Sequence, residues 1–297
     1  MNHYYSHVAA SISEGRSDKE ALASGLMATT TSNPELPNEL LDNIVDLLHD
    51  IPGALKACCL VSKSWIPRAR RHLFSRSAFR TAERLRSWKA TFPDPSTSPA
   101  CYARFLLIKY PQAITVVDVE EGGLIQTFSQ VVYLEMEIDG TGVDEPEASL
   151  VPFHGFLPAL KFLHVSFKGV SSLYVFDFIE SFHHLQSLAV YPCDAYDPTY
   201  GFHEPPVIIP PSGPLAFAGF LELSLGTSVD PIASQLLSLP NGLHFRELRL
   251  DLKHDEDNVL ATALVERCSS TLENLYLIRE NFGMTTQPTG ICIHTDK

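Results

Sequence analysis

The segment LPALKFLHV, residues 157–165, spaces its apolar side chains first three residues apart and then two. Leu157, Leu160 and Leu163 give the first spacing, and Leu163 with Val165 gives the second. An alternation of two predicts a short strand with one buried face. Because such a strand cannot bury its apolar side alone, the segment predicts neighbours of the same kind.

Seven stretches of this kind occur between residue 100 and the C-terminus. They are 106–108, 134–138, 163–165, 188–190, 221–225, 248–252 and 275–277. Their first leucines lie 28, 29, 25, 33, 27 and 27 residues apart, which is the spacing range of leucine-rich repeats. Segments 175–182, 230–239 and 258–268 between them have helical periodicity. We therefore expect a curved, leucine-rich-repeat-like solenoid with a parallel sheet over residues 101–283.

A second architecture fits the same alternation of strands and helices, namely an irregular doubly wound α/β domain. The near-constant spacing and the short strands favour the solenoid. The asparagine that follows the strand in regular leucine-rich repeats is mostly missing, so the repeats are degenerate. The longest interval contains Pro205-Pro206 and Pro210-Pro211, which predict an extended surface loop.

Residues 34–76 follow a different pattern, that of three short amphipathic helices. Pro37 suits the first turn of a helix, and Ser62 or Ser64 can cap the third. The first helix has one apolar stripe, formed by Leu40, Leu41, Ile44, Leu47 and Leu48. Three helices in about 40 residues bury little surface, so a unit of this size tends to need a partner.

The order of apolar residues in this segment resembles an F-box. The matching residues are Leu36-Pro37, Ile44, Leu47-Leu48, Leu55, Leu60-Val61-Ser62, Trp65 and Leu73-Phe74. The layout, with a short N-terminal tail and leucine-rich strands downstream, also resembles the large F-box families of mushroom-forming fungi. The fold class we expect is mixed α and α/β: a small three-helix F-box followed by the solenoid.

The resemblance implies a role and a set of contact residues. F-box proteins bind the Skp adaptor of a Skp–cullin–F-box ubiquitin ligase and do no covalent chemistry themselves. By position, the residues expected to bind the adaptor are Leu36, Pro37, Leu40, Ile44 and Leu55. Val61, Trp65 and Leu73 are expected to anchor the helices to one another. The partners implied are a Skp-type adaptor, through it a cullin, and a protein substrate.

Charge is distributed by segment. Residues 1–55 carry net −6, residues 56–89 carry +9, and residues 90–297 carry −16, which gives −13 for the chain. An acidic repeat region repels phosphate, so we expect no nucleic-acid partner. We interpret the basic segment as a solvated helical face, because aromatic residues suited to base stacking are not interleaved with it apart from Trp88.

If the repeats form a solenoid, the residues that alternate with the leucines face the concave side. The predicted substrate face consists of Glu135, Glu137, His164, Ser166, Tyr191, Glu222, Arg249, Asp251 and Tyr276. Ala189, Ser224 and Ile278 belong to the same set. A protein degron could bind there, or the face could simply be solvated, and the sequence does not rank these two possibilities.

Residues that could carry chemistry are sparse. The six cysteines include no CxxC pair, and no Walker, GxSxG, GxGxxG or HExxH motif is present. His183, His184, Cys193 and His203 match no common metal spacing. The acidic run Asp255-Glu256-Asp257 lacks the glycine of a calcium loop and reads as a solvated turn. We expect no catalytic residue, no metal and no cofactor.

The remaining boundaries follow from composition. We expect a disordered tail over 1–33, a linker helix and loop over 77–100, and a poorly ordered C-terminus over 284–297. Residues 1–19 contain no apolar stretch of signal-peptide length, and no apolar run in the sequence reaches the length of a membrane span, so we expect a location in the cytoplasm or nucleus. Two rival functions stay open: an F-box protein that acts outside ubiquitin ligases, and a small α/β hydrolase.

Overall fold

The computed structural model describes residues 37–109, 125–140, 157–182, 184–192, 218–226, 229–239, 242–279 and 289–294. The chain separates into two compact units, Met1–Ala69 and Arg70–Lys297. We call their described parts the helical unit, residues 37–69, and the sheet unit, from residue 70 onward. The tail predicted over residues 1–33 and the proline pairs of the long loop lie outside the described residues.

The helical unit contains three short helical elements before the division at Ala69. They are α1 (Asn38–Leu47), α2 (Pro52–Val61) and the 3-10 turn η1 (Lys63–Trp65), and α3 (Ile66–Leu73) begins here. Pro52 opens α2, where its missing N–H costs no hydrogen bond. The hydroxyl of Ser62 accepts a hydrogen bond from the backbone N–H of Ser64 at 3.3 Å, as one of the two predicted caps.

Helix α1 is apolar over a wider arc than its own unit covers. Val45 is 1 % exposed and belongs to the small core, with Leu41 and Leu48 half-buried beside it. Leu40, Ile44 and Leu47 lie one residue earlier, so they form a stripe about 100° away around the helix axis. Their exposed fractions are 48 %, 42 % and 80 %. The single stripe expected from the sequence is therefore two stripes, and only one is buried.

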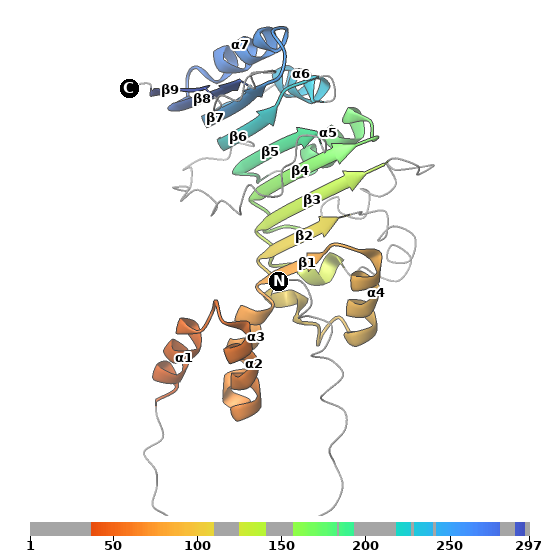
Figure 1. The fold of residues 1–297 in the computed structure, drawn as a ribbon, viewed down its shortest axis with the longest axis vertical. Coiled ribbons are helices and arrows are strands. Elements are labelled where there is room, and N and C mark those ends of the chain that lie inside the picture. The colour runs from red at the N-terminus through yellow and green to blue at the C-terminus, as the bar shows by residue number, and fades with distance from the viewer. Residues whose placement is uncertain are drawn as a thin grey trace, which may run out of the picture. The chain divides into compact units, whose positions relative to one another are not determined.

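The sheet unit is built on nine strands that lie side by side in sequence order (Figure 1). They are β1 (Arg76–Phe79), β2 (Phe105–Lys109), β3 (Tyr133–Asp139), β4 (Phe162–Lys168), β5 (Ser187–Pro192), β6 (Ala218–Ser224), β7 (His244–Leu252), β8 (Asn274–Arg279) and β9 (Thr289–His294). Strands β1 to β8 are parallel, and β9 is antiparallel to β8. The expected mixed α/β class with a parallel sheet is confirmed.

The first leucines of the seven repeated stretches form one column across the sheet. In register they are Leu106, Leu134, Leu163, Leu188, Leu221, Leu248 and Leu275. Each of them is at most 7 % exposed. The seven leucines therefore stay opposite one another across the sheet even though the segments between the strands differ in length.

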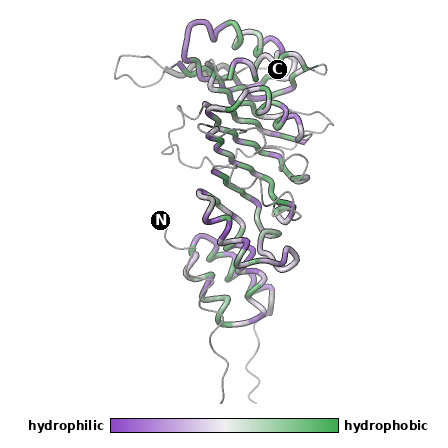
Figure 2. The backbone as a smooth tube through the Cα atoms, turned by 90° about the vertical axis from the view of Figure 1, so that its right-hand side faces the viewer, coloured by the Kyte–Doolittle hydropathy of each residue, from purple (hydrophilic) through white to green (hydrophobic). Residues whose placement is uncertain are grey.

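Helices cover the leucine side of the sheet. Helices α5 (Ser172–Glu180), α6 (Asp230–Ser238) and α7 (Asp257–Cys268) coincide with the helical segments expected from the sequence. Their buried residues, such as Phe178, Ile232 and Leu264, share one core cluster with the leucine column. Figure 2 shows stretches of apolar colour along the strands, whereas the helices alternate between apolar and hydrophilic colours. No helix in the described ranges has the length and apolarity needed to cross a membrane.

Two segments differ from expectation. The stretch 77–100 is not a linker, because it carries most of β1, helix α4 (Ala82–Thr91) and the 3-10 turn η2 (Pro99–Tyr102) of the sheet unit. Leu85 and Ala100 are buried in the same core as the leucine column, next to the 3-10 turn η4 (Ile125–Phe128). Residues 289–294, expected to be poorly ordered, form β9 and pair along β8.

Gly219 allows β5 and β6 to approach closely where the register shifts. Its φ is +137°, and a Cβ added there would lie 2.0 Å from the carbonyl oxygen of Gln186. The register between β6 and β7 shifts at Gly219/Phe220. A side chain at this position would therefore clash with backbone, so glycine is required for the longest repeat to stay in line with its neighbours.

Candidate functional site

The residues expected to contact an adaptor fall into three groups. Pro37, Leu40 and Ile44 are exposed at the start of the helical unit. Leu55 is 1 % exposed, so it belongs to the core of that unit and presents no surface to a partner. Leu36 lies outside the described residues. Val61, expected as an internal anchor, is 68 % exposed instead.

The exposed apolar side chains of the helical unit extend beyond the expected set. Together with Leu40 and Ile44 they are Leu47, Ile51, Leu60 and Val61, and we call these six residues the apolar surface. Sequence periodicity could identify the apolar arc of α1 but not which part of it a neighbouring helix covers. The interior that the unit does bury is small, with Val45, Leu55, Cys58 and Ala69.

The predicted substrate face lies on the side of the sheet opposite the leucine column, and we call it the polar face. Strand pairing lines up Glu135, His164, Ala189, Glu222, Arg249 and Tyr276 in one row. Glu137, Ser166 and Tyr191 form a second row, and Asp251 pairs with Ile278 farther along it. Leu107 and Ala189 are buried yet do not belong to the core cluster, which agrees with their place on this face.

A third row on the polar face was missed. It begins with Phe105, Tyr133 and Phe162, whose rings stack at 4.7 Å and 6.3 Å between centroids. Ser187, Phe220 and Glu247 continue the row across β5, β6 and β7. The signal was in the sequence for all of these residues except Phe105, because each of the others precedes a predicted face residue by two, which keeps it on the same side of a strand.

Five residues of the polar face form a carboxylate–tyrosine cluster: Tyr133, Glu135, Tyr191, Glu222 and Arg249. The Arg249 Nε lies 3.1 Å from Glu222 Oε1, and the Tyr191 hydroxyl donates a hydrogen bond to Glu222. Burial raises the pKa of Tyr133 above its usual range, and the charges of Glu135 and Glu222 raise it further. Burial raises the pKa of Tyr191 as well, and Glu222 raises it further.

His164 lies in the row between Glu135 and Ala189. Its ring packs against that of Tyr191, with 4.9 Å between the two centroids. Burial lowers its pKa to about 4, because the charged form of an imidazole loses its hydration in the interior. His164 is therefore neutral near pH 7 and adds no positive charge to this face. Burial also raises the pKa of Glu247, and Glu222 raises it further.

The other predicted face residues have local partners. Lys109 forms an ion pair with Glu137 across β2 and β3. The Ser224 hydroxyl donates to Asp251 Oδ2 at 3.3 Å. Ser166 is only 4 % exposed, so it contributes little surface. These contacts hold side chains of neighbouring strands in fixed positions around the cluster.

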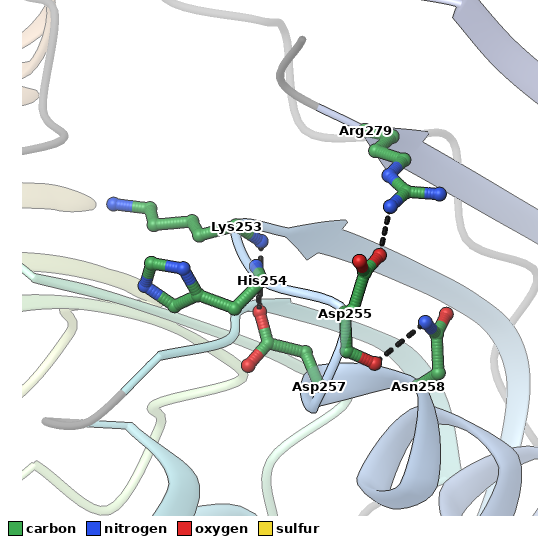
Figure 3. A network of polar contacts seen from close by, with 6 residues as sticks. All are labelled: Lys253, His254, Asp255, Asp257, Asn258 and Arg279. Carbon is green, nitrogen blue, oxygen red and sulfur yellow. Dashed lines mark hydrogen bonds and ion pairs between the residues drawn. The ribbon is translucent and has the colours of Figure 1, made fainter. Parts of the chain in front are cut away.

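The acidic run after β7 is a structural turn and not a solvated one throughout (Figure 3). Asp257 is 3 % exposed and accepts hydrogen bonds from the backbone N–H groups of Lys253 and His254 at 2.8 Å and 2.7 Å. Asp255 forms an ion pair with Arg279 of β8. These contacts attach the start of α7 to the ends of two strands. Within the described ranges no group of three or more His, Cys, Asp or Glu side chains could hold a metal ion.

Neither a protein-family model nor a curated protein sequence matches this chain. The chain has two surfaces of different chemistry: the apolar surface of the helical unit and the acidic, tyrosine-rich cluster of the polar face. The described residues of the polar face supply hydrogen-bond acceptors and negative charge, which suit recognition of another molecule.

Proposed function

We propose that this chain is an F-box protein that recruits a protein substrate to a Skp–cullin–F-box ubiquitin ligase. Its helical unit would bind the Skp-type adaptor, and its sheet unit would be a leucine-rich-repeat-like solenoid that binds the substrate. Such a subunit would act by raising the effective concentration of substrate lysines near the conjugating enzyme.

The observation that carries the proposal is the second apolar stripe of α1. Leu40, Ile44 and Leu47 are exposed although Val45 on the same helix is buried. The exposure of six apolar side chains in so small a unit supports binding of a partner, because apolar patches of this kind mark protein interaction sites. The stripe falls within the segment that resembles an F-box, which names the class of partner.

The solenoid is supported by the strand order and by the leucine column. Each strand pairs only with its neighbours in sequence, as expected of stacked repeats. A doubly wound sheet would instead change direction at a switch point in its strand order.

Adaptor binding is tested by measuring the affinity of the full-length chain for a recombinant Skp-type adaptor. The variant L40A/I44A should bind at least about tenfold more weakly, since buried apolar anchors dominate interface energies. L36A/P37A should also weaken binding. L173A/Y174A is the matched control, because these two apolar residues of α5 are 53 % and 49 % exposed. Unchanged affinity of L40A/I44A would overturn the role of the stripe.

The ligase role is tested by affinity purification of the chain from cells treated with a proteasome inhibitor. We expect both adaptor and cullin among the purified proteins, together with a ubiquitinated substrate. Adaptor without cullin would identify an F-box protein that works outside ubiquitin ligases. Loss of cullin in L40A/I44A, but not in L173A/Y174A, would connect the complex to the apolar surface.

A further inference from the structure

Helix α1 has few means of holding its own conformation. It is ten residues long, and the residue before it, Pro37, gives no side-chain hydrogen bond to its first backbone N–H groups. Isolated helices shorter than about 12 residues are marginal in water. The last turn contains Asp46 and no basic residue, and a negative charge at the C-terminal end of a helix is unfavourable. Helix α1 therefore depends on contacts with the rest of the helical unit.

One such contact is an ion pair between Asp46 of α1 and Arg68 of α3. The Arg68 Nε donates a hydrogen bond to Asp46 Oδ1 at 2.6 Å, and Arg68 Nη2 donates to Asp46 Oδ2. Two parallel hydrogen bonds of this kind fix the direction of the two groups as well as their distance. The Arg68 and Asp46 side chains are 32 % and 35 % exposed, so solvent screens their charges only in part. The pair therefore ties the last turn of α1 to the first turn of α3.

Three consecutive residues of α1 show what this ion pair controls. Ile44 is 42 % exposed, whereas Val45 is 1 % exposed and lies in the core of the unit. Consecutive residues are about 100° apart around a helix axis, so Ile44 and Asp46 lie on opposite sides of Val45. A helix held only along the Val45 side could roll about its axis. The second attachment at Asp46 opposes that rotation, and it thereby fixes the direction in which Ile44 faces.

We propose that the Asp46–Arg68 pair positions α1 for adaptor binding, by holding the stripe of Leu40, Ile44 and Leu47 in the orientation that the adaptor accepts. The pair acts through α1 and not by contact with the adaptor. It raises the fraction of free chains in the binding-competent orientation, and the apparent affinity is proportional to that fraction. This inference rests on the proposed function and adds two positioning residues to it.

Binding kinetics distinguish a positioning residue from a contact residue. The association and dissociation rate constants of the full-length chain are measured on an immobilised recombinant Skp-type adaptor. R68Q should lower the association rate constant about threefold to fivefold, the scale of one partly exposed ion pair. The dissociation rate constant should stay unchanged, because the bound adaptor holds α1 in place. Faster dissociation of R68Q, or no change in either constant, would overturn the proposal.

The sign of the charge change separates positioning from electrostatic steering. D46N removes a negative charge and R68Q removes a positive one, so steering by net charge would move their association rate constants in opposite directions. Loss of the ion pair should lower both constants. R279Q is the matched control, because it breaks the Arg279–Asp255 ion pair of the sheet unit and should alter neither rate constant. Opposite shifts of D46N and R68Q would contradict a positioning role.

The reversed pair D46R/R68D should rescue binding. An arginine in the last turn of α1 and an aspartate in the first turn of α3 both suit the helix dipoles, so the reversal costs neither helix stability. D46R alone places two cations together and should associate at least about fivefold more slowly than the wild-type chain, whereas the double variant should come within about twofold of it. Association as slow in the double variant as in D46R would count against the proposal.

A measurement on the free chain keeps this inference separate from the proposed function. Amide hydrogen exchange across residues 38–47 should be faster in R68Q than in the wild-type chain or R279Q, because α1 opens more often without the ion pair. Equal exchange would overturn the inference without any use of the adaptor. Weak binding of L40A/I44A beside normal association of R68Q and D46N would remove only the positioning role. Normal binding of L40A/I44A would remove the proposed contact together with the positioning role that rests on it.

Discussion

The two units use the same kind of residue in opposite ways. Among the described residues, six of the nine exposed large apolar side chains lie in the helical unit, although this unit comprises only residues 37–69. In the sheet unit the leucine column is at most 7 % exposed and is covered by helices. The sheet unit therefore covers its apolar core with helices, whereas the helical unit leaves part of its apolar surface exposed. The exposure of the apolar side chains, and not the leucine content, therefore distinguishes the two units.

The strongest test of this contrast compares two leucine-to-alanine substitutions. Leu221→Ala removes a fully buried side chain from the leucine column and should lower the free energy of unfolding by about 2–5 kcal/mol. Leu60→Ala removes a side chain that is 84 % exposed and should change it by less than about 0.5 kcal/mol. Urea unfolding of the two full-length variants measures both values. Similar losses in the two variants would break the comparison.

The polar face makes the stability of the sheet unit depend on pH. The pKa of His164 is about 4 in the folded chain and about 6.5 when unfolded. Between these values the unfolded state binds the extra proton, so stability is complete above pH 6.5 and falls as the pH drops toward 4. The loss approaches about 3 kcal/mol.

Comparison with His164→Phe isolates this contribution. Glu135 beside His164, and the raised carboxyl pKa values of Asp230 and Glu247, act in both proteins and cancel in the difference. The difference between the unfolding free energies measured at pH 7 and at pH 4.5 should therefore be smaller in the variant than in the wild-type chain. Parallel pH curves would show that His164 is protonated in the folded state.

The turns before α6 and α7 each contain an aspartate that accepts backbone hydrogen bonds, but the two aspartates accept different numbers of them. Asp257 accepts two backbone N–H groups and is buried, whereas Asp230 accepts one, from Gly226 at 2.9 Å, and is half-buried. Asp257→Ala should therefore cost about 1–3 kcal/mol, and Asp230→Ala about half as much. Thermal unfolding gives the ranking. A larger loss of stability for Asp230→Ala would mean that the number of backbone hydrogen bonds does not determine the contribution of these side chains.

A conservative substitution of Trp88, in α4, should have a small effect. Its ring packs between Phe74, Phe79, Phe92 and Phe128, and its indole N–H is buried without a hydrogen-bond partner among the described residues. Trp88→Phe removes that polar group, which offsets the lost contacts, so stability should change by less than about 1.5 kcal/mol. Trp88→Ala, the cavity-forming control, should cost about 3–5 kcal/mol.

The strands with leucines could be predicted because their signal is local. The alternating residues of β2 to β8 identify each strand without knowledge of its neighbours. Strand β1 is short and lies within the basic segment, and its two apolar residues, Ala78 and Phe79, were too few to predict a strand. Strand β9 has Ile291 and Ile293 in alternation but no leucine repeat, and its antiparallel direction breaks the pattern.

The candidate sites were predictable only in part. Alternation placed Glu135, His164 and Glu222 on one face, but their alignment in one row depends on the strand register, which the sequence does not give. The exposure of Leu40 and the burial of Leu55 depend on how α1 and α2 pack, which periodicity alone does not encode. Composition identified apolar residues, and tertiary packing decided which of them remain in water.

The leucine column also has an evolutionary consequence. Leu221 and Leu248 are 27 residues apart and occupy equivalent positions in adjacent strands, so one strand with its helix is an interchangeable module. A duplication or deletion of one such module would leave every other strand paired as before. Changes in module number would alter which side chains become neighbours on the opposite side of the sheet. A lineage could therefore vary the surface on that side of the sheet while keeping the same interior.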